Sequence, residues 1–182
     1  RIIIRGQEMR YWKQFRAGKT IDKLFVLDGC QDGPVKSILR EAKKTDTIIN
    51  FVDKERLDRL ANSGHHQGVV AQAAAYEYAE VEDILNAAKE KGEAPFIFIL
   101  DEIEDPHNLG AIIRTANLCG AHGVIIPKRR AVGLTATVAK TSAGAVNYTP
   151  VAKVTNIAKT IEELKKEGMW FVCAEYGRTD DV

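Results

Sequence analysis

The chain has 182 residues, of which 45% are hydrophobic and 28% are charged, a composition that favours a globular protein over a disordered or fibrous one. No apolar run is long enough to cross a bilayer, and the opening RIIIRGQEMR contains only three consecutive apolar residues, too few for a signal peptide. We therefore expect a cytoplasmic protein without a membrane partner.

Charge is distributed unevenly along the chain, although the net charge is only +1. Residues 1–75 hold 14 Lys and Arg against 9 Asp and Glu, a net charge of +5, whereas residues 76–182 hold 12 against 16, a net charge of −4. A basic N-terminal part suits a polyanionic partner such as nucleic acid. Basic residues also solvate the surface of any small domain, so charge alone leaves both interpretations open.

Strand and helix patterns alternate in the N-terminal part. The opening residues carry six basic side chains and one acid with interleaved aromatics, and they are typical of a helix that ends at Gly18. Further along we expect buried strands over 23–27, 47–52 and 69–75, and helices over 33–44 and 53–62, the second capped by Asp53. This alternation predicts a small α/β unit.

Residues 76–95 differ in composition, with six acids against two lysines and Pro95 at the end. We expect them to form a mobile linker that is helical over about 81–91, between a domain over 1–75 and a second domain over 96–182.

The C-terminal part opens with the apolar run FIFIL at 96–100, which is typical of a parallel strand covered on both faces. Helices are expected over 108–119 and 156–168, and further strands over 123–127 and 169–175. These elements predict a second α/β unit.

The turn from the strand at 96–100 into the next helix has features of a binding site. Gly110, Arg114 and Asn117 fall on one flank of that helix, and helical side chains lean toward the N-terminus. Arg114 should therefore reach back over Gly110, where no side chain blocks it, toward Asn108. This is the carboxyl end of the strand, where open α/β sheets bind ligands, and a helix N-terminus attracts phosphate.

Structural roles explain the same residues equally well. Asn108 could act only as an N-cap, Gly110 could only permit close packing, and Arg114 could pair with one of the acids among residues 101–105. The residue pattern by itself leaves these alternatives open.

The stretch LDEIEDPHNLGAIIRTANLCGAHGVIIP (100–127) resembles the first signature of the SpoU/TrmH family of RNA ribose 2′-O-methyltransferases, which belongs to the SPOUT superfamily. The matching residues are Asp105, Pro106, Asn108, Gly110, Arg114, Thr115 and Ala116. TVAKTSAGAVNYTPV (137–151) is similar to the next family segment. AGKTIDKLFVLDG and HHQGVVAQAA resemble the N-terminal RNA-binding domain of the bacterial 23S rRNA guanosine 2′-O-methyltransferases.

The resemblance implies an α/β fold in two domains. Residues 1–75 would form a small, ribosomal-protein-like RNA-substrate-binding domain and 76–95 a linker. Residues 96–182 would form the N-terminal part of a SPOUT-type knotted methyltransferase domain with a parallel sheet. The family's cofactor loops follow these segments, so cofactor-binding residues are expected beyond Val182, and the chain over 1–182 is expected to bind the cofactor poorly.

The resemblance also implies a reaction and its partners. The activity would be methylation of a ribose 2′-hydroxyl, in a guanosine of bacterial 23S rRNA, with S-adenosyl-L-methionine as methyl donor. The full-length protein would be a homodimer. Two other functions stay open: a noncatalytic RNA-binding fragment and a tRNA 2′-O-methyltransferase.

The family role of catalytic arginine falls on Arg114. Because arginine stays protonated, we expect Arg114 to orient the 2′-hydroxyl or a phosphate and to stabilise negative charge, with Asn108 positioning Arg114 or the ribose. RNA contacts are predicted for the following residues, which a solvated loop and a tight turn also explain: Lys128, Arg129, Arg130, Ser142 and Gly144.

No metal is expected. Cys30, Cys119 and Cys173 are far apart and lack CxxC spacing, which favours reduced thiols. The histidines also lack ligand spacing, and we expect them in loops or in RNA contacts: His65, His66, His107 and His122.

Overall fold

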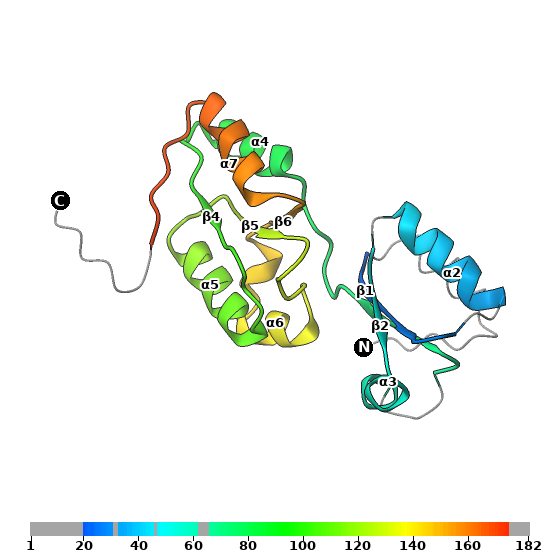
Figure 1. Cartoon of the computed structure of the whole chain (residues 1–182). Coiled ribbons are helices and arrows are strands. Elements are labelled where there is room, and N and C mark those ends of the chain that lie inside the picture. The colour runs from blue at the N-terminus through cyan, green and yellow to red at the C-terminus, as the bar shows by residue number, and fades with distance from the viewer. Residues whose placement is uncertain (1–19, 31–32, 46, 62–65, 175–182) are drawn as a thin grey trace.

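The computed structural model describes residues 20–30, 33–45, 47–61 and 66–174, and it contains two three-stranded sheets. Figure 1 shows the two sheets with their helices as separate units along the chain. We call them the N-terminal unit, up to β3, and the C-terminal unit, from α4 onward. The helix predicted to end at Gly18 lies outside the described residues.

The N-terminal unit is a mixed sheet in the order β2-β1-β3. Its strands are β1 (Ile21–Leu27), β2 (Ile48–Val52) and β3 (Val69–Ala73). The central strand β1 runs parallel to β2 and antiparallel to β3. The predicted strands are thus confirmed, with their ends shifted by one or two residues.

One helix covers each face of this sheet. Leu24 and Val26 of β1 pack with α2 (Gly33–Lys44), and Phe25, which points to the opposite face, packs with α3 (Lys54–Ala61). This follows from the period of two in a strand and from helices that bury one stripe. The backbone N–H of Arg56 donates to Asp53 Oδ1 (2.7 Å), which confirms Asp53 as the cap of α3.

The C-terminal unit is a parallel sheet in the order β4-β5-β6. Its strands are β4 (Ile97–Ile99), β5 (Gly123–Pro127) and β6 (Val151–Val154). Every residue of the central strand β5 is buried, as expected for a parallel strand with helices on both faces.

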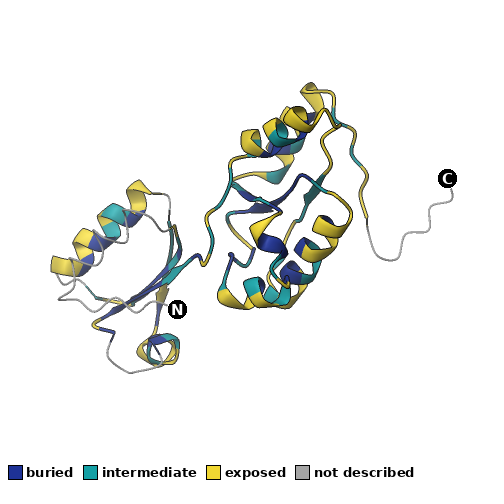
Figure 2. Cartoon of the chain, turned by 180° about the vertical axis from the view of Figure 1, so that it is seen from behind, coloured by how far each residue is buried: buried dark blue, intermediate teal, exposed yellow. Residues whose placement is uncertain are grey.

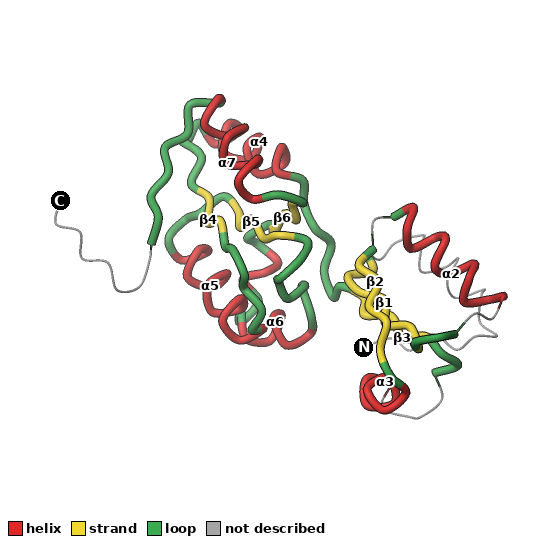
Figure 3. Tube along the Cα trace, in the orientation of Figure 1, coloured by secondary structure: helices red, strands yellow, loops and turns green. Residues whose placement is uncertain are grey.

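Helices lie on both sides of this sheet (Figures 1 and 3). One face is covered by α5 (Pro106–Leu118), α6 (Ala136–Thr141) and the short 3₁₀ helix η1 (Ala145–Asn147). The other face is covered by α4 (Val81–Lys91) and α7 (Ile157–Lys166). Figure 2 shows that each of these helices is buried along one side and exposed along the other.

Helix α4, which has the predicted bounds, packs in the C-terminal unit. Its N-terminus carries a reciprocal cap between Glu80 and Asp83, and Gly92 ends it in the left-handed conformation. Ile84 is fully buried against β5, where Gly123 leaves room for its side chain. The segment that crosses from one unit to the other is therefore shorter than the predicted linker and lies just before α4.

The strand predicted over 169–175 is wrong for the residues that are described. Met169 and Phe171 pack on the cluster around Ile84, while Trp170 and Val172 are exposed. The side chains alternate as in a strand, but no ladder of hydrogen bonds joins this segment to another strand in the described part of the chain.

No helix in the described residues has both the length and the apolarity that a membrane span requires.

Replacing Ile84 by alanine should lower the free energy of unfolding by about 2–5 kcal/mol, because a fully buried side chain leaves a cavity over β5. Urea unfolding followed by circular dichroism measures the loss. The matched control is Asn86→Ala on the exposed side of the same helix, which should change little. Equal stability of the two variants would show that α4 acts as a mobile connection.

Candidate functional site

Helix α5 begins at the carboxyl end of β4 and is capped by Asp105. The backbone N–H of Asn108 donates to Asp105 Oδ1 (2.8 Å), and Pro106 takes the first helical position, where its missing N–H costs nothing. The interpretation of Asn108 as N-cap is therefore wrong, and the predicted helix start at 108 moves to Pro106. The Asn108 side chain is exposed and is not used for capping.

Gly110 is a packing residue rather than an opening for Arg114. A Cβ atom at this position would lie 2.8 Å from Thr141 Cβ and 3.0 Å from the backbone nitrogen of Ser142, and closer still to Thr141 Oγ1. Thr141 Oγ1 donates to the carbonyl of Pro106 (3.2 Å). The predicted free space above Gly110 is thus filled by α6, because only a glycine allows the two helices to approach so closely.

Arg114 is exposed on α5, and in the described part of the chain its side chain makes no ion pair or hydrogen bond. Three of the nearby acids that could have paired with it have other partners. Glu102 pairs with Arg130 (2.7 Å), Asp105 caps α5, and Asp101 accepts from the backbone of Glu102. An exposed guanidinium without a carboxylate partner retains its five donors for an external anion or hydroxyl.

Asn117, on the predicted flank with Arg114, accepts a hydrogen bond from Thr149 Oγ1 (3.1 Å) and so ties α5 to the segment before β6. Ser142 is fully buried, and its hydroxyl donates to the carbonyl of Ala139 (2.9 Å). Ala143 and Gly144 follow with φ of +51° and +85°. The structure therefore places Ser142 and Gly144 in a tight left-handed turn that leads into η1.

The loop after β5 brings Lys128, Arg129 and Arg130 to the same sheet edge as the start of α5. The N–H of Lys128 donates to the carbonyl of Val154 (2.8 Å), which fixes the loop to β6. Arg130 and Glu102, which form the ion pair, both have positive φ, +55° and +51°. This backbone conformation is uncommon for non-glycine residues and clusters at functional sites.

The same loop lines a cleft of about 670 Å³ between the two units. The N-terminal unit contributes Lys23 from β1 and Lys43 from the end of α2, together with residues of β2, and Thr155 follows β6. Sequence reasoning missed Lys23 and Lys43. In the sequence these two lysines contribute only to the net positive charge of the N-terminal part. Nothing in their neighbouring residues indicates which lysines face another unit.

A buried polar cluster joins the two units next to this cleft. Lys153 of β6 forms an ion pair with Asp22 of β1, whose side chain is fully buried. The Tyr78 hydroxyl donates to Asp22 Oδ1 (2.8 Å) and accepts from the N–H of Leu134 (2.8 Å). The Lys153 ammonium also lies 4.4 Å from the centre of the Tyr78 ring, a cation–π arrangement.

Burial dominates the electrostatics of this cluster. It lowers the pKa of Lys153 below its ordinary value, while Asp22 opposes that shift. Burial also raises the pKa of Tyr78 well above its usual range, and the neighbouring Asp22 charge adds to the effect. Tyr78 is therefore a neutral hydrogen-bond donor at any physiological pH.

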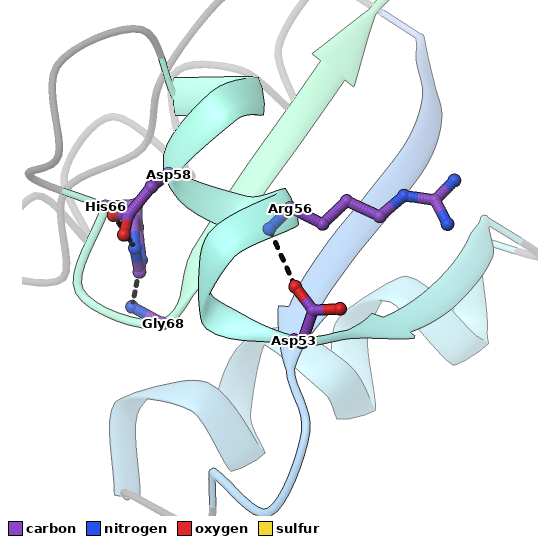
Figure 4. A network of polar contacts seen from close by, with 5 residues as sticks. All are labelled: Asp53, Arg56, Asp58, His66 and Gly68. Atoms are coloured by element: carbon purple, nitrogen blue, oxygen red, sulfur yellow. Dashed lines mark hydrogen bonds and ion pairs between the residues drawn. The ribbon is translucent and has the colours of Figure 1, made fainter.

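Two of the predicted loop histidines are buried structural residues. His66 Nδ1 accepts from the N–H of Gly68 (3.0 Å) and Nε2 contacts Asp58 Oδ1 (2.9 Å), as Figure 4 shows. His122 repeats the arrangement: Nδ1 accepts from the N–H of Phe96 (3.1 Å) and Nε2 contacts Glu93 Oε2 (3.0 Å). An RNA contact is thus wrong for both rings. His107 is exposed, and His65 lies outside the described residues.

The described residues contain no group of three or more His, Cys, Asp or Glu side chains that could hold a metal ion. S-adenosylmethionine does not fit the described cleft either, because its sulfonium carries a positive charge and the cleft is lined by five cationic side chains. The expectation that its binding residues follow Val182 stays a prediction.

Family models match both parts of the chain. The SpoU rRNA Methylase family model matches residues 95–182, and the model for RNA 2′-O ribose methyltransferase substrate binding matches residues 14–79. A Bacillus subtilis protein whose name places it among the TrmH family tRNA/rRNA methyltransferases is 51% identical over 166 residues, which cover 91% of this chain and 66% of that protein. A Staphylococcus haemolyticus relative with the same family name is 48% identical over 165 residues, again 91% and 66%. The chain thus spans 66% of the length of these curated relatives.

Two solved structures align with this chain over most of its length. The SpoU methyltransferase AviRb from Streptomyces viridochromogenes, in complex with AdoMet, aligns with 17% identity and a TM-score of 0.43, over 91% of this chain and 58% of its own. An AdoMet-bound rRNA methyltransferase from Sinorhizobium meliloti aligns with 22% identity and a TM-score of 0.42, over 85% and 54%.

Gly110→Ala should destabilise the protein by about 1–3 kcal/mol, because the new methyl group forces α6 away from α5. Thermal and urea unfolding measure the change. Gly33→Ala is the matched control, since no heavy atom lies within 4 Å of the added carbon there. Adding Thr141→Ala should recover part of the loss, and a Gly110→Ala variant with wild-type stability would contradict the packing role.

Proposed function

Because the chain belongs to the SpoU/TrmH family of RNA methyltransferases, we propose that the protein transfers a methyl group from S-adenosylmethionine to a ribose 2′-hydroxyl of RNA, in a guanosine of bacterial 23S rRNA. The observation that carries the proposal is Arg114, exposed on α5 and without an acidic partner in the described part of the chain.

Arg114 has the chemistry that this reaction requires. A neutral hydroxyl is a weak nucleophile, and the developing negative charge on its oxygen needs stabilisation. The guanidinium donates to the 2′-oxygen and to an adjacent phosphate, whose oxygen takes the departing proton. When bound, S-adenosylmethionine would supply the methyl group, and S-adenosylhomocysteine would leave as the carbon–sulfur bond gave way to the new carbon–oxygen bond. Holding the two reactants in line contributes several kcal/mol of barrier reduction.

Asn108 positions the ribose in this proposal. It lies on the turn before Gly110, its backbone N–H is used by the cap, and its exposed amide offers both a donor and an acceptor. Lys128, Arg129 and Arg130 bind RNA beside it at the same sheet edge. Ser142 and Gly144 remain predicted contacts through the turn before η1.

Support for 23S rRNA comes from the N-terminal unit. The resemblance of residues 17–29 and 65–74 to the RNA-binding domain of the 23S rRNA enzymes favours that substrate, whereas the names of the relatives cover both tRNA and rRNA. We propose a homodimer for the full-length protein, as in the family. A tRNA substrate is the second candidate, carried by the same family names.

In the full-length protein, Arg114→Ala should reduce methyl transfer at least a hundredfold, while the affinity for S-adenosylmethionine stays within about twofold. Transfer of labelled methyl groups to rRNA and calorimetric titration of the methyl donor measure the two effects. Arg114→Lys should not restore activity, because an ammonium lacks the planar fork. The control Lys166→Ala, an exposed cation on α7, should keep wild-type turnover, and near-normal turnover of Arg114→Ala would remove the residue from the mechanism.

The full-length protein should methylate unmodified 23S rRNA and leave tRNA unmodified. Mass spectrometry of nuclease digests identifies the methylated nucleoside, which should be 2′-O-methylguanosine. Methylation of tRNA alone would establish the second candidate, and binding of RNA without methylation of either substrate would favour the noncatalytic alternative.

A further inference from the structure

The cleft between the two units has a composition that selects for an extended polyanion. Five of its lining side chains are cationic: Lys23, Lys43, Lys128, Arg129 and Arg130. Among the residues that the structure describes, no carboxylate lines it. Arg130 is paired with Glu102, whereas Lys23, Lys43 and Arg129 have no ion pair in the described part of the chain. Unpaired like charges gathered in one concavity repel each other, and a polyanion relieves that repulsion.

The exposure of these cations distinguishes a polymer from a small ligand. Lys43, Arg129 and Arg130 are exposed and Lys23 and Lys128 half-buried, so no cationic side chain is enclosed. Sites for small ligands surround most of the ligand surface. Cations spread over two walls of an open cleft suit successive phosphates of one nucleic acid strand.

The two walls are held by the buried cluster at their base. Lys23 follows Asp22 directly in β1, and Thr155 lies two residues after Lys153 in β6. The loop that carries Arg129 is fixed to β6 through the hydrogen bond from Lys128 to Val154. The Asp22–Lys153 pair therefore connects the strand behind one wall to the strand behind the other.

Tyr78 adds further contacts across the junction between the units. Tyr78 bonds both to Asp22 and to Leu134, and Gly133, beside Leu134, approaches Asp22 so closely that a Cβ atom there would overlap its carboxylate. The N–H of Ala75 also donates to the carbonyl of Leu134 (2.7 Å). Because these hydrogen bonds and close contacts are short and directional, rotation of one unit against the other breaks several of them together.

We propose that the cleft binds the phosphate backbone of the RNA substrate across both units, and that the Asp22–Lys153–Tyr78 cluster sets the spacing of its walls. The inference rests on the proposed function for the identity of the polyanion. RNA held there runs over the loop after β5, and the ion pair of Arg130 with Glu102 links that loop to the segment leading into α5. The cleft thus orients RNA toward Arg114, and Asp22 and Lys153 act as positioning residues without touching it.

The first test removes charge from each wall separately in the full-length protein. The variants are Lys23→Gln/Lys43→Gln for one wall and Arg129→Gln for the other. The control Lys89→Gln/Lys91→Gln removes two exposed charges from α4, outside the cleft. A short mixed-sequence RNA labelled with fluorescein serves as probe, because phosphate contacts carry no sequence information.

The double-lysine variant should bind the probe about tenfold more weakly, and its plot of log affinity against log salt should lose a slope of about 0.7–0.9 per contact removed. Arg129→Gln should lose about one such contact, and the control should stay within about twofold. Loss of affinity from one wall only, or from the control as much as from the cleft, overturns the proposal.

The second test separates positioning from stability at the junction. Lys153→Met leaves the Asp22 carboxylate buried without its partner, which is strongly destabilising, whereas Asp22→Asn/Lys153→Met removes both charges and keeps the volume. We expect the double variant to unfold near the wild-type midpoint and still to bind the probe several-fold more weakly, with a changed distance distribution in small-angle X-ray scattering. Wild-type affinity and an unchanged distance distribution in the double variant overturn the positioning role.

The methylation assay keeps this proposal apart from the proposed function. Wall variants that retain RNA affinity while Arg114→Ala abolishes transfer would overturn the cleft alone. Wall variants that lose RNA affinity in a protein that methylates no RNA would overturn the proposed reaction and uphold the cleft.

Discussion

The parallel alignment of β4, β5 and β6 is the constraint on which the rest of the site depends. Parallel strands bring all their carboxyl ends to one edge, so the segments that follow them must meet there. The capped start of α5, the basic loop after β5 and the residues after β6 come together for this reason alone. The ion pair between Glu102 and Arg130 is the visible join between the first two segments.

The helical periodicity of α5 places its packing residues on one face and its candidate catalytic residue on another. Leu109, Ile113 and Ala116 are fully buried against the sheet and α6, and Arg114 lies on the remaining exposed arc. Gly110 has no side chain and so allows α6 to pack closely against α5. The exposed arc is therefore presented by a rigidly packed helix, which is the arrangement that a residue needs in order to position a substrate precisely enough for reaction.

The buried ion pair at the junction between the units fixes their relative orientation more than it stabilises the fold. Taking the Asp22 and Lys153 charges out of water costs several kcal/mol per ion, which their mutual attraction offsets only with good geometry. Within the described residues, Asp22 Oδ2 is buried and accepts no hydrogen bond, so the pair is not optimised for stability. Directional contacts of this kind fix one arrangement among those that an apolar interface would tolerate.

Several features were predictable because they depend on neighbours in sequence. The bounds of α4, the cap at Asp53 and the buried strand β5 follow from spacing, cap chemistry and a short apolar run. The signature residues Asn108 and Arg114 were also recognisable, because both lie within a few residues of each other in α5. The segment at 169–174 shows the limit of such reasoning, because its alternation is that of a strand and only a partner strand could have made it one.

By itself, the sequence determined the alternation of strands and helices, the basic character of the N-terminal part and the signature around α5, all of which are encoded over short distances. Only the tertiary structure decided which charges act together. Asp22 and Lys153 are separated by 131 positions, and nothing near either residue distinguishes it from a solvated side chain. Their burial, like the facing of Lys23 and Lys43 toward the loop after β5, exists only once the two units are packed against each other, because desolvation and charge proximity are properties of the folded surface and not of any segment.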